Sequence, residues 1–104
     1  MKRIELNDGI YFGELKDDAP HGRGSIHFKN GGKYEGDFHD GEIQGKGTYI
    51  YPNGNKYEGD FVNSKRHGYG KLYWTRGEYY EGDFQDDYRH GIFLLSFSYS
   101  FFLI

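Results

Sequence analysis

Histidine is the first residue type in this sequence that could do chemistry. His21, His67 and His90 each precede a glycine and are spaced at multiples of 23 residues. A shared zinc site would need their nitrogens within about 2.1 Å of one ion. If each copy forms two strands of a sheet at roughly 4.8 Å each, neighbouring copies lie about 10 Å apart, so one ion cannot contact all three. We interpret these histidines as residues that structure loops, with separate exposed sites as the alternative.

Carboxylates are the second candidate, because a pair of acids can hydrolyse a glycosidic bond. The acidic pairs recur in register as Glu35, Asp37, Glu58, Asp60, Glu81 and Asp83. An active site normally occurs once, whereas these acids repeat in successive copies and have basic or polar neighbours. Their repetition favours a structural role.

Two further catalytic motifs are incomplete. Residues 41–47, GEIQGKG, have three residues between the outer glycines where a phosphate-binding loop has four, and Gly47 stands where a hydroxyl would bind magnesium. Ser25 and Ser64 lie in no nucleophile-elbow motif. The sequence therefore predicts a protein that is not an enzyme, with no catalytic residues, no cofactor and no metal site.

Composition narrows the partners. The 104 residues include no cysteine, which excludes a disulfide framework and thiolate metal ligands. Aromatic residues interleaved with basic ones could stack on single-stranded nucleic acid, but 13 basic and 16 acidic residues give a net charge of −3. We expect no nucleic-acid partner. The 21 aromatic residues make a small core feasible although only 36% of the chain is hydrophobic.

No targeting segment is expected. The first six residues carry charges with no apolar run after them, and no stretch reaches the roughly 20 apolar residues of a membrane-spanning helix. We expect a cytoplasmic location, with association to the cytoskeleton or to a membrane as alternatives.

A fixed interval of 23 residues organises the sequence. Tyrosines mark it at Tyr11, Tyr34, Tyr57 and Tyr80, and glycines follow two residues later at Gly13, Gly36, Gly59 and Gly82. Fourteen of the 17 glycines fall in columns of this interval, which indicates a repeat architecture.

These columns resemble the MORN repeat (membrane occupation and recognition nexus). The matching stretches are YEGDF at 34–38, 57–61 and 80–84, the looser YFGEL at 11–15, HGRG at 21–24, QGKG at 44–47 and HGYG at 67–70. The resemblance covers residues 11–91 and ends where Phe93 replaces the second glycine of the family motif. It implies an elongated twisted sheet with an aromatic groove. By resemblance, members include cytoskeletal and ciliary scaffolds, junction proteins, and regulatory modules of lipid kinases or a lysine methyltransferase.

We divide the chain accordingly. Residues 1–10 form an N-terminal half-repeat cap, 11–33, 34–56 and 57–79 are full repeats, 80–91 is a partial fourth repeat, and 92–104 is a hydrophobic strand or tail. The alternation of residue types in each repeat predicts a β-hairpin, so the fold class is all-β: an elongated, twisted antiparallel meander with one hairpin per repeat.

The hairpin register follows if a six-residue loop, such as 62–67, connects the two strands. Phe61 then faces Gly68, Gly59 faces Gly70 and Tyr57 faces Leu72, all on one face. The opposed glycines leave hollows that aromatic rings can cover. The other face is predicted to be charged, with the cross-strand ion pairs Glu14–Arg23, Asp37–Lys46 and Glu58–Lys71.

The predicted function is a binding or scaffolding platform that recognises protein through this aromatic face and its hairpin loops. The candidate contact residues are Tyr34, Phe38, Tyr49, Tyr51, Tyr57, Phe61, Leu72, Trp74, Tyr80 and Phe84. The alternatives are a phospholipid-binding module with weak lipid contact, and a regulatory module of a larger enzyme. Anionic lipid binding wants clustered basic residues, and only Lys65-Arg66-His67 offers such a cluster.

The last 13 residues, IFLLSFSYSFFLI, carry no charge and alternate like a strand. We expect either a cap that folds over the groove, a surface for self-association into a homo-oligomer, or a truncated gene product. The candidate self-association residues are Phe93, Leu95, Phe97, Tyr99, Phe101 and Leu103.

Overall fold

The computed structural model describes the backbone of residues 2–86, 88–90, 94–97 and 100–103, and the side chains of residues 2–86. Within these ranges every regular element is a strand, which confirms the all-β prediction. The strands are β1 (Lys2–Leu6), β2 (Gly9–Lys16), β3 (Ala19–Phe28), β4 (Lys33–His39), β5 (Glu42–Ile50), β6 (Lys56–Val62), β7 (Lys65–Tyr73), β8 (Tyr79–Gln85), β9 (Tyr88–His90), β10 (Leu94–Phe97) and β11 (Ser100–Leu103).

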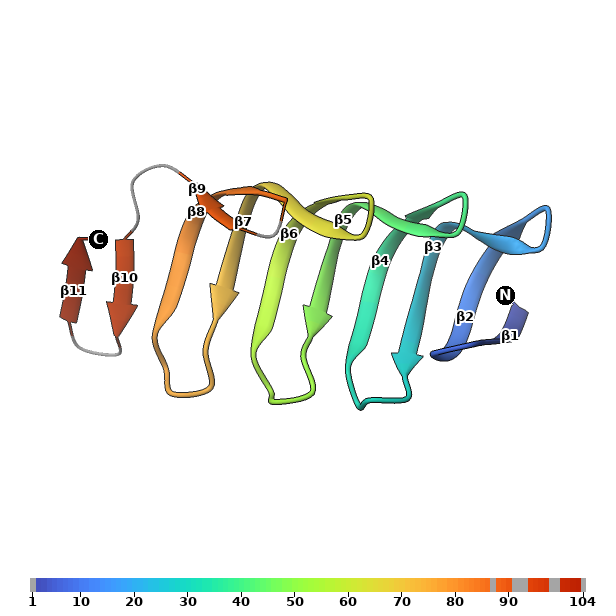
Figure 1. Ribbon diagram of the computed structural model, residues 1–104, viewed down its shortest axis with the longest axis horizontal. Coiled ribbons are helices and arrows are strands. Elements are labelled where there is room, and N and C mark those ends of the chain that lie inside the picture. The colour runs from blue at the N-terminus through green and yellow to red at the C-terminus, as the bar shows by residue number, and fades with distance from the viewer. Residues whose placement is uncertain (1, 87, 91–93, 98–99, 104) are drawn as a thin grey trace.

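All strands belong to one antiparallel sheet in which β1 to β8 pair in chain order. β9 and β10 both pair with β8, and β10 pairs with β11. Hairpins therefore lie side by side along a molecule of 46 × 23 × 19 Å, with the two termini at opposite ends (Figure 1). The predicted meander with one hairpin per repeat is confirmed.

The middle of each hairpin has the predicted register. Tyr57 pairs with Leu72 and Gly59 with Gly70. The glycine pairing continues from strand to strand, so one line of glycines crosses seven strands. We call this line the glycine row: Gly13, Gly24, Gly36, Gly47, Gly59, Gly70 and Gly82.

The predicted six-residue loop is wrong. β6 and β7 continue past it and are joined by only two residues, Asn63 and Ser64, whose φ angles are 51° and 63°. Positive φ at both central residues matches a type I′ turn, whose twist fits that of the flanking strands. Phe61 consequently faces Arg66 and not Gly68, a shift of two residues from the predicted pair.

This shift comes from a bulge in the second strand of each hairpin. Between the pairs Gly36–Gly47 and Phe38–Ile43, β4 advances two residues and β5 advances four. Gly45 lies within the extra length at φ 105°, a conformation that glycine adopts without steric cost. The bulge bends the strands, so the outer arm of each hairpin turns away from the direction of the strands (Figure 1, top).

The bulge also corrects two predicted ion pairs. The Glu14 carboxylate accepts a hydrogen bond from the backbone N–H of Arg23 at 2.6 Å, and Asp37 accepts one from the N–H of Lys46 at 3.1 Å. The side chains pair instead with the next repeat, Arg23 with Asp37 at 3.0 Å and Lys46 with Asp60 at 2.6 Å. The acids are structural, as predicted, but they bond the backbone of the bulge.

The third predicted pair has the right register but different contacts. Glu58 lies opposite Lys71, yet its Oε1 atom is 3.5 Å from Lys56 Nζ. Lys71 Nζ lies 4.2 Å from the ring centroid of Tyr79, within the range of a cation–π contact. Exposed pairs of this kind contribute no more than about 1 kcal/mol.

The core is a chain of alternating tyrosine and phenylalanine rings beneath the bent arms. Tyr34 packs edge-to-face against Phe38 at 5.2 Å and Phe61 at 5.3 Å, and Tyr57 does so against Phe61 and Phe84, both at 5.0 Å. The same contacts link Tyr11 to Phe38 and Tyr80 to Phe84. A single-layered sheet thus buries its aromatic rings by folding back on itself.

The tyrosine rings lie against the glycine row, as predicted. A Cβ atom added at Gly47 or Gly70 would collide with the ring of Tyr34 or Tyr57. Each hydroxyl donates a hydrogen bond to the backbone carbonyl three residues on: Tyr11 to Glu14 (2.6 Å), Tyr34 to Asp37, Tyr57 to Asp60 and Tyr80 to Asp83 (2.9 Å each). Glycine is required here because the ring occupies the place of a side chain.

Neighbouring hairpins are joined at their tips as well as along the sheet. The N–H of Gly41 donates to the carbonyl of Pro20, and the N–H of Ser64 donates to that of Ile43, both at 2.9 Å. Each tip therefore closes onto the arm of the preceding repeat.

The recurring histidine takes part in this joint. The N–H of Asp40 donates to His21 Nδ1 at 3.2 Å, and in the next copy the N–H of Asn63 donates to Gln44 Oε1 at 3.3 Å. For His21 the interpretation as a loop-structuring residue is confirmed.

The substitution His21→Ala is expected to lower the free energy of unfolding by about 1 kcal/mol, because the N–H of Asp40 loses its acceptor. His21→Gln is the matched control, since Gln44 makes the equivalent bond, and it is expected to stay within about 0.5 kcal/mol of wild type. Urea unfolding measures both values. Equal losses in the two variants would show that the hydrogen bond is not the cause.

Candidate protein-binding surfaces

The aromatic face predicted to bind a partner divides into buried and accessible residues. Seven of its ten residues are at most 8% exposed: Tyr34, Phe38, Tyr57, Phe61, Leu72, Tyr80 and Phe84. Such side chains cannot contact a partner while the fold is closed. Tyr49, Tyr51 and Trp74 are half-buried and pack on the edge of this core, so they remain available to a ligand.

Tyr51 and Trp74 line a groove of about 510 Å³, which we call the inner groove. Its remaining lining residues are Pro52, Asn53, Asn55, Arg66 and Leu72. Both aromatic residues directly follow a strand and begin the turn to the next repeat. Backbone bonds fix these turns: Tyr51 N–H donates to the carbonyl of Asn55 at 2.8 Å, and Trp74 N–H to that of Glu78 at 2.9 Å.

The row of accessible rings extends toward the N-terminus through Phe28. Its ring stacks on Tyr49 at 5.5 Å with an interplanar angle of 25°, and Tyr49 lies 4.8 Å from Tyr51. Sequence reasoning missed Phe28, although it occupies the same column of the 23-residue repeat as Tyr51 and Trp74. Comparing copies column by column would have found it.

Arg66 was also missed as an inner-groove residue. Its guanidinium carbon lies 5.2 Å from the ring centroid of Phe84 and 5.9 Å from those of Tyr51 and Tyr57. The equivalent positions in the first two repeats are apolar and buried, Pro20 and Ile43. The column of residues 20, 43, 66 and 89 carries the signal, because it changes there from apolar residues to arginine.

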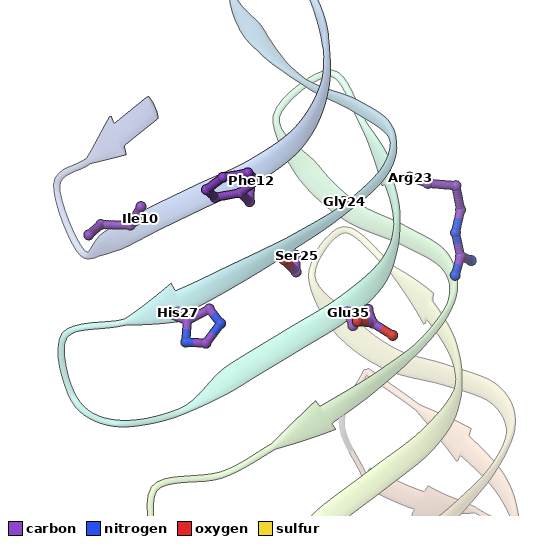
Figure 2. Close-up of a pocket in the computed structure, with 7 residues that line it drawn as sticks. All are labelled: Ile10, Phe12, Arg23, Gly24, Ser25, His27 and Glu35. Atoms are coloured by element: carbon purple, nitrogen blue, oxygen red, sulfur yellow. The ribbon is translucent and has the colours of Figure 1, made fainter. Parts of the chain in front are cut away.

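The outer face was predicted to be charged, and at its N-terminal end this is wrong. Ile10 and Phe12 line a shallow pocket of about 590 Å³ on this face of β2 (Figure 2), and Phe12 is 49% exposed. The same two columns hold Lys33 and Glu35 in the second repeat. The first repeat therefore replaces a charged pair with an apolar one.

The polar residues of this outer pocket form no catalytic relay. Ser25 and His27 come from β3 and Glu35 from β4, and Figure 2 shows the three side chains apart from one another. Among the described residues, no hydrogen bond joins them. In residues 2–86, the acids and histidines also form no cluster of three that could hold a metal ion.

Tyrosines alter the other end of the outer face. Tyr69 is 47% exposed and stands where earlier repeats have Arg23 and Lys46, and its hydroxyl donates to the carboxylate of Glu81. This hydrogen bond raises the pKa of Tyr69. Tyr73 and Tyr79 pair across the strands with ring centroids 5.9 Å apart. The outer face is thus charged mainly in its middle.

The six predicted self-association residues, Phe93, Leu95, Phe97, Tyr99, Phe101 and Leu103, lie outside the residues whose side chains the structure describes. Their role stays a prediction. In the part of the chain that is described, no helix is long and apolar enough to cross a membrane.

Comparison with known proteins identifies the repeat. The family model of the MORN repeat matches four consecutive segments, residues 11–33, 34–56, 57–79 and 80–92. These segments coincide with the successive hairpins of the sheet. No curated protein matches the chain.

Proposed function

Because the chain belongs to the MORN-repeat family, we propose that it is a non-catalytic binding module that holds a protein partner in the inner groove. MORN repeats form a module often involved in membrane or protein association. The observation that supports a protein partner is the row of half-buried rings, Phe28, Tyr49, Tyr51 and Trp74, which continues the core out to solvent. Aromatic side chains of this kind are favoured anchors at protein interfaces.

Charge favours a protein over a phospholipid surface. Anionic membranes attract clusters of exposed lysine and arginine, and the best cluster in this sequence is Lys65-Arg66-His67. Of these residues only Lys65 is exposed, whereas Arg66 lines the inner groove and His67 is half-buried. The remaining basic side chains on the middle of the outer face pair with acids, as Arg23 does with Asp37.

Site-specific photo-crosslinking tests the proposal. A benzophenone amino acid is placed at position 51 in the inner groove or at position 69 on the outer face, and the full chain is irradiated in extract of its source cell. We expect a defined set of protein adducts from position 51, and their loss when Trp74→Ala is added. Phe12→Ala on the outer face is the matched control and should leave them unchanged. Adducts only from position 69, or none from 51, would contradict the proposal.

A sedimentation assay tests the phospholipid alternative. We expect the full chain to stay in the supernatant with vesicles of phosphatidylserine and phosphatidylcholine at physiological salt. Co-sedimentation that is lost in Lys65→Glu would instead favour membrane association.

A further inference from the structure

The inner groove contains one charged side chain among its described lining residues, that of Arg66. In the first two repeats this inward position is filled by Pro20 and Ile43, which are buried. A cation at such a position loses part of its hydration. The third repeat therefore keeps an ionic group at a place where the fold itself is built with apolar residues.

The surroundings of Arg66 hold its guanidinium in one orientation. Ring faces of Tyr51, Tyr57 and Phe84 lie within 5.9 Å of its central carbon. Rings at this distance attract a cation and favour a fixed plane for the guanidinium. A guanidinium offers five N–H donors in a rigid fork and no acceptor, and its geometry matches a carboxylate.

The polar groups beside Arg66 reinforce this preference. The Oδ1 atom of Asn53 accepts from the N–H of Asn55 at 3.0 Å, and Oδ1 of Asn55 accepts from the N–H of Thr75 at 3.1 Å. Both amide oxygens are therefore used inside the turns, and each amide NH₂ is a donor only. Since none of the described lining residues is a carboxylate, the inner groove is rich in donors and poor in acceptors.

We propose that the inner groove recognises a partner segment in which an aspartate or glutamate lies next to a large apolar side chain. The apolar side chain packs between Tyr51 and Trp74, and the carboxylate accepts hydrogen bonds from Arg66. This inference rests on the proposed function and adds the class of partner sequence. A basic segment is disfavoured, because the groove would place its cation against the guanidinium.

Peptide selection tests the inference. The full chain is used to select from a phage library of random 12-residue peptides, in parallel with Arg66→Ile, Arg66→Glu and Trp74→Ala. Arg66→Ile is the matched variant, because it installs the residue that Ile43 places in the same column and should fold. Thermal unfolding verifies the fold of each variant.

We expect the wild-type chain to enrich peptides with an acid beside an aromatic or large aliphatic residue. Arg66→Ile should keep the apolar preference and lose the acidic one, Arg66→Glu should enrich lysine and arginine, and Trp74→Ala should lose the apolar preference. One selected peptide is then synthesised with Glu, Gln or Lys at the acidic position. We expect Glu→Gln to weaken binding to wild type by about ten- to a hundredfold, the range for a hydrogen bond to a charged group, and to change binding to Arg66→Ile by less than threefold.

The failures of the two proposals are distinguishable. Peptides that need Trp74 but show no acidic enrichment, or identical peptides from wild type and Arg66→Glu, would overturn this inference and leave the groove as a protein-binding site. Recovery of no peptide that depends on Trp74 would contradict both proposals.

Discussion

The substitution Gly59→Val is expected to lower the free energy of unfolding by at least about 3 kcal/mol, the upper end of the usual cost of overpacking. A Cβ atom at this position would lie 2.5 Å from the Cα atom of Gly70 and 2.6 Å from the carbonyl oxygen of Tyr69. Both neighbours are backbone, so neither can move aside without opening the sheet. The hydroxyl of Tyr57, at 2.7 Å, closes the remaining side.

Urea unfolding followed by circular dichroism measures this loss, and Gly31→Asn is its control. Gly31 lies in a turn at φ 98°, which asparagine tolerates better than most residues, and a Cβ atom there would meet no heavy atom within 4 Å. We expect this control to change stability by less than about 1 kcal/mol. If Gly59→Val melts at the wild-type temperature, the glycine row is not packed as described.

The second large effect is expected at high pH, where the protein should unfold cooperatively. Burial raises the pKa of the tyrosine phenols at Tyr11, Tyr34 and Tyr57. Neighbouring carboxylates, such as Asp37 beside Tyr34, raise the pKa further. In the unfolded chain a phenol ionises near pH 10, so the folded state binds more protons than the unfolded state above that pH.

The sign of the pH dependence follows directly. The stabilisation is complete below about pH 10 and decreases as pH rises from the unfolded pKa toward the folded one. Each tyrosine that ionises only on unfolding contributes a loss of about 1.4 kcal/mol per pH unit. Three such residues together exceed the stability of a typical small domain within about two pH units.

Absorbance at 295 nm reports ionisation, and far-ultraviolet circular dichroism reports unfolding in the same titration. We expect ionisation of the buried tyrosines and loss of the sheet to coincide. The double variant Tyr34→Phe/Tyr57→Phe is the control and should lose stability less steeply above pH 10. Ionisation of these tyrosines near pH 10 with the sheet intact would contradict the prediction.

The centre of each hairpin could be predicted from sequence because three independent features agree there. The alternation of residues, the paired glycines and the turn at Gly54 all require Tyr57 to lie opposite Leu72. The outer arms could not be predicted in the same way. Only one tip, Asp40-Gly41, has a strong sequence signal for a two-residue turn, whereas the equivalent tip Asn63-Ser64 lacks glycine.

The candidate site shows a different limit. Residue parity placed Tyr49 and Tyr57 on one face correctly, but parity carries no information on which of them the bent arm covers. Burial depends on the bulge near Gly45, because the bulge brings Phe61 over its neighbours. The contact residues were therefore predicted as one set, although the fold buries seven of the ten.

The odd length of the repeat has a consequence for how such a chain can grow. In a continuous strand, residues 23 positions apart would point to opposite faces, yet Tyr34 and Tyr57 share the core. The reversal is compensated within each copy: Tyr34 to Tyr49 is an odd step across the hairpin, and Tyr49 to Tyr57 is an even step across the next turn. Duplication or loss of a whole copy therefore preserves the inside and outside of the sheet, whereas insertion of a single residue into one turn inverts every strand beyond it. Evolution can vary the length of this surface only in whole copies.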